Sequence, residues 1–297
     1  MITCRSRARS AARTSTGSGA SSPSGRLAAP HSPPSGLAVP NGHQWPGLGI
    51  QGWGYDLLPM ENEPGLGEAG GASDFGLDAA YSVDGPDDNR ALYKAWAATY
   101  DGFLEQNRYI YARQVAEFFN RRSSARDEPV LDVGCGTGVV GAALRHLGVP
   151  LIDGLDISLE MMAKARQRTG PDGSSVYRRL IEADLTGPLD LASDTYAGIV
   201  SAGTFTHGHV GPDGLAELVR IARPGSVCSI GINAAHFDAH GFRDHLDRYA
   251  AEGRVSGLEV TLRPMYEDAD GSELDHMTQI AVFVVTDGTH DTDGPSQ

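Results

Sequence analysis

The apolar positions of residues 89–120 recur at steps of three and four along the chain. This spacing places them on one face of a helix, so the segment is predicted to be helical. Asp101-Gly102 is expected to divide it into two helices. The apolar positions that carry the pattern are Leu92, Trp96, Tyr100, Phe103, Leu104, Val115, Phe118 and Phe119.

From residue 129 onward, short apolar runs alternate with amphipathic segments. Strands are predicted over 129–133, 151–155, 176–182, 196–201, 227–232, 258–262 and 279–285. Helices are predicted over 139–147, 215–222, 242–251 and from the N-cap Ser158 through residue 168.

This alternation predicts an α/β fold. Strands separated by helices form a Rossmann-like, doubly wound and mostly parallel sheet, covered on both faces in three α/β/α layers. The last two strands have no helix between them, so we expect an antiparallel hairpin that places an antiparallel strand at the sheet edge.

Composition separates an N-terminal arm from this region. The first 88 residues contain 15 Gly, 9 Pro and 11 Ser, a composition typical of disorder, which predicts a disordered arm over 1–88 and one folded domain over 89–297. Residues 1–26 are rich in Arg and Ser and lack acidic residues. This composition fits any of three interpretations: a transit peptide, an ordinary disordered tail, or a protein whose translation starts at Met60. We expect a cytoplasmic protein, or an organelle-matrix protein if residues 1–26 direct transit.

Charge and cysteine content limit the partners. The net charge is −14, with +4 over residues 1–59 and −18 over the remainder, and an acidic domain repels nucleic-acid phosphates. The longest apolar run, 280–285, is too short to span a membrane. Three scattered cysteines form no CxxC pair, so neither a metal site nor a disulfide framework is expected. The oligomeric state is left open.

A glycine-rich turn follows the first predicted strand. Glycine lets the backbone approach a ligand closely, and the following helix presents free N–H groups to the crevice where such folds bind ligands. Asp156, at the end of the next strand, can accept hydrogen bonds from both hydroxyls of a ribose, and Asp184, after the third strand, can accept one from an adenine amino group. These residues together predict a nucleoside site. The turn contains Gly134, Cys135, Gly136 and Gly138.

The glycine turn with Asp132, Asp156 and Asp184 resembles that of class I S-adenosylmethionine-dependent methyltransferases. The resemblance covers about residues 91–285. Within that superfamily, LYKAWAATYDGFL (92–104) and SAGTFTHGH (201–209) are similar to the Williams–Beuren-region methyltransferase-like proteins. The resemblance to the superfamily implies S-adenosylmethionine as cofactor and lid helices over 89–120.

The resemblance also implies residue roles. The three glycines would contact the methionine part of the donor, Asp156 would hold the ribose, and Asp184 would face the adenine amino group. Ile157 would flank the adenine, and Tyr100 would lie on a lid helix. The full expected cofactor set is Tyr100, Asp132, Gly134, Cys135 (through its backbone), Gly136, Gly138, Asp156, Ile157, Asp184, Leu185 and Ser201.

A dinucleotide oxidoreductase is the main alternative. Residues 136–141 spell GxGxxG, and Asp156 follows about 20 residues later, as the NAD fingerprint requires. Asp132 has no role in that fingerprint but is expected in the methyl-donor pattern, and the hairpin ending belongs to the methyltransferase sheet order. Both observations favour the methyl donor. A donor-binding protein without turnover is a further alternative.

The acceptor side is expected in the loop after the fourth strand. His207 in that loop can deprotonate a hydroxyl or amine near neutral pH, although a purely structural imidazole fits the sequence as well. No Asn/Asp-Pro-Pro-Tyr/Phe motif follows this strand and no Pro-Cys pair is present, which argues against nucleic-acid bases as acceptors. We expect methyl transfer to an oxygen or nitrogen of a small molecule, with a protein side chain as the second possibility.

Overall fold

Seven strands form one sheet in the described part of the chain. In the computed structural model, described residues are 86–124, 127–206, 210–268 and 276–287, all within one compact unit, Gly67–Gln297. The strands are β1 (Val130–Val133), β2 (Ile152–Asp156), β3 (Arg179–Glu182), β4 (Tyr196–Phe205), β5 (Ala222–Asn233), β6 (Val255–Pro264) and β7 (Met277–Val285). Their order in the sheet is β3-β2-β1-β4-β5-β7-β6.

The first five strands are parallel, and their register aligns the ends that carry the site. Val133 at the end of β1 pairs with Leu155 of β2 and with Ser201 of β4. β1 and β2 are buried along their whole length, as expected for a parallel sheet covered on both faces. β7 is antiparallel to both β5 and β6. The predicted hairpin is therefore confirmed, and β6 is its outermost strand.

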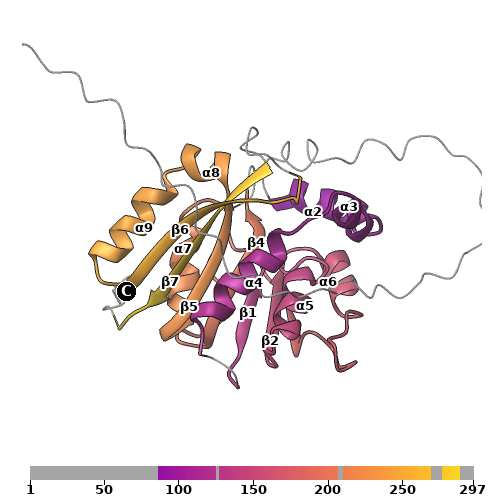
Figure 1. Ribbon diagram of the computed structural model, residues 1–297, viewed down its shortest axis with the longest axis horizontal. Helices are drawn as coiled ribbons and strands as arrows, with labels where there is room; N and C mark the ends of the chain where they lie inside the picture. The colour runs from indigo at the N-terminus through magenta and orange to yellow at the C-terminus, as the bar shows by residue number, and fades with distance from the viewer. Residues whose placement is uncertain (1–85, 125–126, 207–209, 269–275, 288–297) are drawn as a thin grey trace, which may run out of the picture. The chain divides into compact units, whose positions relative to one another are not determined.

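Helices cover the two faces of the sheet (Figure 1). They are α2 (Pro86–Trp96), α3 (Tyr100–Gln106), α4 (Tyr111–Arg122), α5 (Val139–His146), α6 (Leu159–Ala165), α7 (Gly214–Ile221), α8 (Ala234–Ala239) and α9 (Phe242–Ala251). One buried cluster joins the sheet to α4, α5 and α6, and a second joins it to α7, α8 and α9. The predicted three-layer α/β/α fold is confirmed.

The lid region departs from the sequence expectation. Asp101-Gly102 does not break the helix, because both residues lie inside α3, where Gly102 is exposed. The breaks fall instead at residues 97–99 and 107–110. The second break is fixed by tertiary contact, since the N–H of Ile110 donates to the carbonyl of Met265 beyond β6, at 3.0 Å.

The boundaries of other helices and strands also differ from those predicted. β5 begins at Ala222, before the predicted start at residue 227, and runs through Pro224-Gly225 because a register shift against β4 absorbs these residues. Helix α8 was not predicted; Asn233 caps it by accepting a hydrogen bond from the N–H of His236. Helix α6 ends at Ala165 rather than 168. α2 begins at Pro86, so the last three residues of the expected arm are helical, and the rest of the arm lies outside the described residues.

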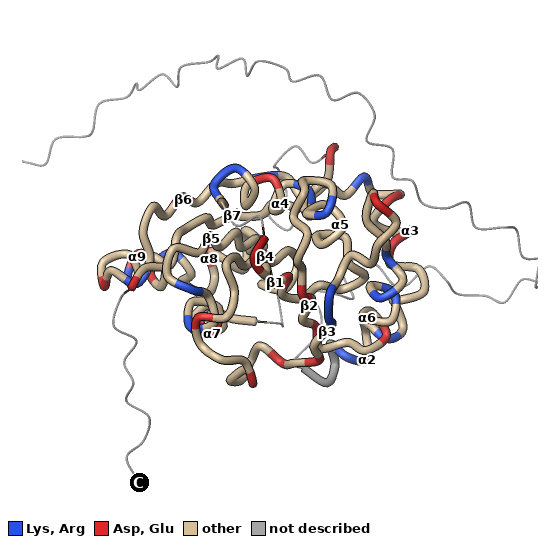
Figure 2. Tube along the Cα trace, turned by 90° about the horizontal axis from the view of Figure 1, so that it is seen from below, with Lys and Arg blue, Asp and Glu red and all other residues tan. Residues whose placement is uncertain are grey.

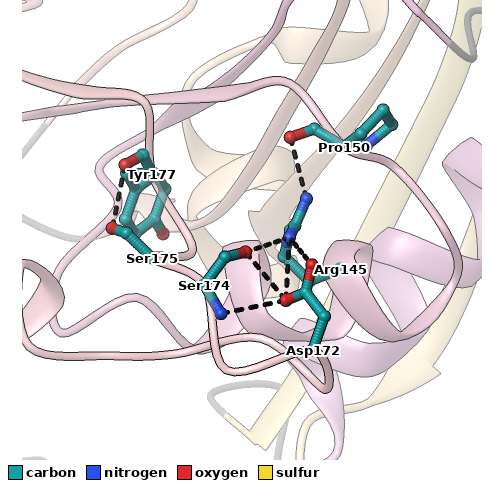
Figure 3. A network of polar contacts seen from close by, with 6 residues as sticks. All are labelled: Arg145, Pro150, Asp172, Ser174, Ser175 and Tyr177. Carbon is teal, nitrogen blue, oxygen red and sulfur yellow. Dashed lines mark hydrogen bonds and ion pairs between the residues drawn. The ribbon is translucent and has the colours of Figure 1, made fainter.

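The loop between α6 and β3 is fastened to α5 by Arg145 (Figure 3). Its guanidinium donates to both carboxylate oxygens of Asp172, to the hydroxyl of Ser174 and to the carbonyl of Pro150. The loop then delivers Tyr177, which is 5 % exposed, to the underside of the glycine turn. This fastening matters for the site because Tyr177 supports that turn.

Basic and acidic positions intermingle on the surface, for example along α9 (Figure 2). Among the described residues, no helix combines the length and apolar character needed to cross a bilayer.

Candidate active site

β1 ends in a tight turn held against β2. The N–H groups of Gly134 and Cys135 both donate to the carbonyl of Leu155, at 2.7 and 2.9 Å. Gly134 and Gly136 have φ values of +67° and +52°, in the left-handed region that side chains other than glycine rarely adopt. A Cβ at Gly134 would also collide with the side chain of Thr204, whereas a Cβ at Gly136 would meet no protein atom within 4 Å. Gly136 therefore faces open space, as a ligand-facing turn requires.

Asp156 ties this turn to the start of α6. Its Oδ2 accepts a hydrogen bond from the N–H of Gly136 at 2.7 Å, and its Oδ1 accepts one from the N–H of Ser158 at 2.8 Å. Burial raises the pKa of the carboxyl group, and the bonds from these N–H groups oppose that rise. A carboxylate has about four acceptor positions, so two remain for hydroxyls of a ligand. Asp156 is thus suited both to shape the turn and to bind.

A cavity of about 100 Å³ opens at the carboxyl ends of the parallel strands, beside the turn. Seven of the predicted cofactor residues line it: Tyr100, Gly134, Gly136, Asp156, Ile157, Asp184 and Leu185. Among the described residues of its wall, Asp156 and Asp184 are the only charged ones. The Oδ1 of Asp184 accepts hydrogen bonds from the N–H and hydroxyl of Thr186, which leaves Oδ2 for a ligand.

Several residues that line the cavity were not predicted from the sequence. Tyr93, Met161 and Thr204 also line the cavity. Tyr93 and Thr204 fall within the two stretches that resemble methyltransferase-like proteins, so that resemblance could have identified them. Met161 lies on an apolar helix face, and the sequence alone does not distinguish a core position there from one that lines a cavity.

Four predicted cofactor residues do not line the cavity. Ser201 is fully buried and donates its hydroxyl to the carbonyl of Val133 at 2.9 Å. The Cys135 side chain is 4 % exposed, and Gly138 is the N-cap of α5 with Tyr177 beside it. Asp132 is the fourth. These four residues lie behind the residues that line the cavity, where they support the glycine turn. Their contact with the donor stays a prediction.

Asp132 lies beneath the glycine turn with no exposed surface. Its Oδ2 accepts a hydrogen bond from the hydroxyl of Tyr177 at 2.7 Å, whereas its buried Oδ1 has no hydrogen-bond partner. Burial raises the pKa of this carboxyl group to about 7, the Tyr177 hydrogen bond opposes the rise, and the nearby charge of Asp156 adds to it. With this pKa the group is about half protonated near neutral pH, and the protonated form suits this position because a buried ionised carboxylate lacks a compensating charge.

A polar latch joins the lid helices to the turn. Asp101 on α3 accepts a hydrogen bond from the hydroxyl of Thr137 at 2.5 Å and lies 2.7 Å from Nη2 of Arg168. The Nε of Arg168 also donates to the carbonyl of Thr137 at 2.8 Å. Tyr100, at the start of α3, reaches the cavity and packs perpendicular to Trp96, with ring centroids 5.0 Å apart. No sequence signal revealed this latch, because its partners are far apart in the chain.

These residues fit an adenosyl sulfonium compound. The open space before Gly136 admits a ligand against the backbone, Asp156 offers acceptors to ribose hydroxyls, and apolar Ile157 and Leu185 can flank a base. No described wall residue is basic, so the cavity offers no side chain to balance a phosphate, whereas its two carboxylates suit a cationic sulfur. This charge pattern favours the methyl donor over a phosphorylated dinucleotide.

A second cavity of about 50 Å³ adjoins the first. Tyr93, Tyr100 and Gly203 line both. Phe205 and Thr206, at the end of β4, also line the second cavity. The predicted base His207 follows Thr206 directly but lies outside the described residues, as does His209. Within the described residues, no three His, Cys, Asp or Glu side chains form a group that could hold a metal ion.

Comparisons with known proteins point to the same cofactor. Residues 130–225 match the family described as a methyltransferase domain. YodH, an uncharacterized methyltransferase of Bacillus subtilis, is 30 % identical over 109 residues, covering 37 % of this chain and 44 % of YodH. Human methyltransferase-like protein 27 is 27 % identical over 173 residues, 56 % of this chain and 68 % of that protein. An O-methyltransferase of Pyrenophora dematioidea is 28 % identical over 128 residues, 40 % of this chain and 44 % of that enzyme.

The chain thus spans less than half the length of two of these three relatives. The similarity to methyltransferase-like protein 27 agrees with the resemblance found in the lid and β4 segments. The matched residues, 130–225, begin with β1 and contain the glycine turn, Asp156 and Asp184. Residues 130–225 therefore form a methyltransferase domain, and this part of the chain resembles the class I superfamily, whose cofactor is S-adenosylmethionine.

Proposed function

We propose that this protein transfers the methyl group of S-adenosylmethionine to an oxygen or nitrogen atom of a small molecule. The observation that carries the proposal is the pair of adjoining cavities. One has two carboxylates and an open glycine backbone on its wall, and the other contains no charged side chain among its described lining residues. The resemblance to an O-methyltransferase supports oxygen as one acceptor atom.

The cofactor supplies a methyl group that is already activated by the positive charge on its sulfur. The protein's task is then to hold the acceptor in line with that methyl group and to exclude water, which can lower the barrier by about 7–11 kcal/mol. We assign the alignment of donor and acceptor to Tyr93 and Tyr100, since both side chains line both cavities. Asp156 and Asp184 would fix the nucleoside end.

The transfer forms a bond between the acceptor atom and the methyl carbon, while the carbon–sulfur bond breaks and its electron pair stays on sulfur. The products are S-adenosylhomocysteine, the methylated acceptor and one proton. We propose His207 as the base that takes this proton, on the strength of its place directly after Thr206 in the sequence. When the acceptor group is already deprotonated at neutral pH, its proton has passed to water before the transfer, and no base is needed.

The test uses the full chain with S-adenosylmethionine labelled in its methyl group. Small-molecule extracts are incubated with the protein, and mass spectrometry detects labelled products. The matched control is Gly136→Ala, which places a Cβ in the open space of the donor cavity. We expect labelled small molecules with the wild-type protein and none with the variant. Donor binding measured by calorimetry, with no labelled product in any extract, would instead identify a donor-binding protein without turnover.

A further inference from the structure

Aromatic side chains dominate the wall of the second cavity. We propose, building on the methyltransferase activity proposed above, that the ring of a neutral aromatic acceptor lies against this wall, where the second cavity meets the first at Tyr93, Tyr100 and Gly203. The substrate class is then a small uncharged molecule that carries a hydroxyl or amino group on an aromatic ring. The methyl group is transferred to that oxygen or nitrogen, with loss of its proton as written above.

The rings come from two parts of the chain. Tyr93, Trp96, Tyr100 and Phe103 belong to the lid helices α2 and α3. Tyr109 precedes α4, Tyr111 is the first residue of α4, and Tyr266 follows β6. Neighbouring rings contact one another on both sides, with centroids 5.2 Å apart for Trp96–Phe103 and 5.7 Å apart for Tyr109–Tyr266. Aromatic pairs at these separations stabilise one another, so an added ring finds the same kind of partner.

The side of the cavity formed by Tyr109 and Tyr266 is held in place by backbone contacts. These two residues form an isolated antiparallel bridge, and the N–H of Glu267 donates to the carbonyl of Arg108 at 3.1 Å. The Arg108 guanidinium also forms ion pairs with Glu267 and Asp268. The wall is therefore preformed, which reduces the entropy lost when a ring binds.

No described side chain of this wall is charged. Its polar groups are tyrosine hydroxyls and the side chains of Thr206 and Asn233, and the Asn233 carbonyl oxygen already accepts a hydrogen bond from the N–H of His236. A carboxylate or phosphate would lose its water here without gaining an ionic partner, which is strongly unfavourable. The lining therefore selects against charged acceptors.

A cation held over ring faces is also disfavoured. Trp96, the side chain with the strongest attraction for cations, is only 4 % exposed, because Tyr93, Tyr100 and Phe103 pack around it. Phe103 and Tyr109 are half-buried, so both keep accessible surface, and both line the cavity. That surface suits the edge and face of a neutral ring.

The first experiment measures ring binding by calorimetry, with the full chain saturated with S-adenosylhomocysteine. The probe is 4-ethylphenol. Its matched comparisons are 4-ethylcyclohexanol, which lacks aromaticity, 4-hydroxyphenylacetate, which is an anion, and tyramine, which is a cation. We expect 4-ethylphenol to bind about three- to tenfold more tightly than the saturated alcohol and at least about tenfold more tightly than either ion.

Tyr109 supplies the matched variants, because it lines the second cavity and not the first. Tyr109→Leu should weaken binding of 4-ethylphenol about three- to tenfold, whereas Tyr109→Phe, which keeps the ring, should stay within about twofold of wild type. Both variants should keep wild-type affinity for S-adenosylhomocysteine, which also verifies that they fold.

The inference fails if the saturated alcohol or either ion binds as tightly as 4-ethylphenol, if 4-ethylphenol does not bind, or if Tyr109→Leu binds it normally. These results differ from failure of the proposed function. If labelled methyl is transferred to a non-aromatic acceptor and the phenol does not bind, the aromatic site is refuted and the methyltransferase function stands. If the phenol binds and no acceptor receives the labelled methyl group, the aromatic site stands and the transfer reaction is refuted.

Discussion

The carboxylate of Asp101 on the lid helix α3 forms an ion pair with Arg168, 67 residues later in the chain, at 2.7 Å. The same carboxylate accepts a hydrogen bond from Thr137, within the glycine turn. One side chain thus joins the lid to the turn that lies against the donor. Lid position and donor binding are expected to be coupled through this contact, because each restrains the other.

Asp101→Asn is expected to loosen the lid. The ion pair is partly exposed, so its loss should cost up to about 1 kcal/mol, or up to about fivefold in affinity for S-adenosylhomocysteine. Hydrogen exchange of α3 should become faster in the same variant. The control is Asp247→Asn, which removes an ion pair with Arg243 on α9, away from both cavities. Equal exchange rates of α3 in the two variants would contradict the coupling.

Asp156→Asn should weaken donor binding and also destabilise the turn. The variant keeps one acceptor oxygen for two backbone N–H groups, from Gly136 and Ser158, and a buried unpaired N–H costs about 1–3 kcal/mol. Loss of charge-assisted bonds to ribose should reduce affinity at least about thirtyfold. Calorimetry measures the affinity and urea unfolding the stability. Unchanged affinity would refute the ribose assignment.

Gly136→Ala and Gly148→Ala form a matched pair. Both glycines have positive φ, +52° and +82°, and a Cβ at either would meet no protein atom within 4 Å. Each substitution should therefore destabilise the fold by about 1–2 kcal/mol from backbone strain. Only Gly136 lines the donor cavity, so only its variant should lose affinity for S-adenosylhomocysteine, by at least about tenfold. Equal affinities would show that the turn does not face the donor.

Asp132 should make stability depend on pH. Its pKa is about 7 in the folded protein against an ordinary 3.8, so the folded state binds more protons than the unfolded state between these values. Stability contributed by the protonated group is therefore complete below about pH 4 and is lost as pH rises to about 7, by at most about 1.4 kcal/mol per pH unit.

Comparison with Asp132→Asn isolates this contribution, because asparagine stays neutral and can still accept the hydrogen bond from Tyr177. Urea unfolding at about pH 5 and about pH 8 should show the wild-type protein losing stability relative to the variant at the higher pH. A constant difference between the two proteins would show that Asp132 is already ionised at low pH.

His207→Gln is predicted to slow methylation of a hydroxyl acceptor about a hundredfold if His207 is the general base. The wild-type rate should rise with pH as the imidazole loses its proton, and the variant should lose that rise. His209→Gln serves as the control and should keep the wild-type profile. An unaltered pH profile in His207→Gln would leave His207 with a structural role only.

Parts of the fold were predictable because they depend on neighbours in sequence. Ser158 caps α6 by accepting a hydrogen bond from Met161, three residues later, as the sequence suggested. The lid helices show the opposite case. Gly102 carries a local breaking signal, yet the chain breaks at 107–110, where Ile110 bonds to Met265, and no local pattern records that contact.

The α/β fold, the closing hairpin and the expectation of a nucleoside site at the glycine turn all followed from the pattern of residues along the chain. Periodicity and backbone freedom are local properties, and the order of strands and helices restricts topology. The tertiary structure decided which predicted residues face the cavity and which stand behind it, such as Asp132 and Ser201. It also assembled the latch at Asp101 and the aromatic cavity. Contacts between residues far apart in the chain depend on how the helices and strands pack. The order of residue types along the chain does not specify whether two such side chains point toward each other.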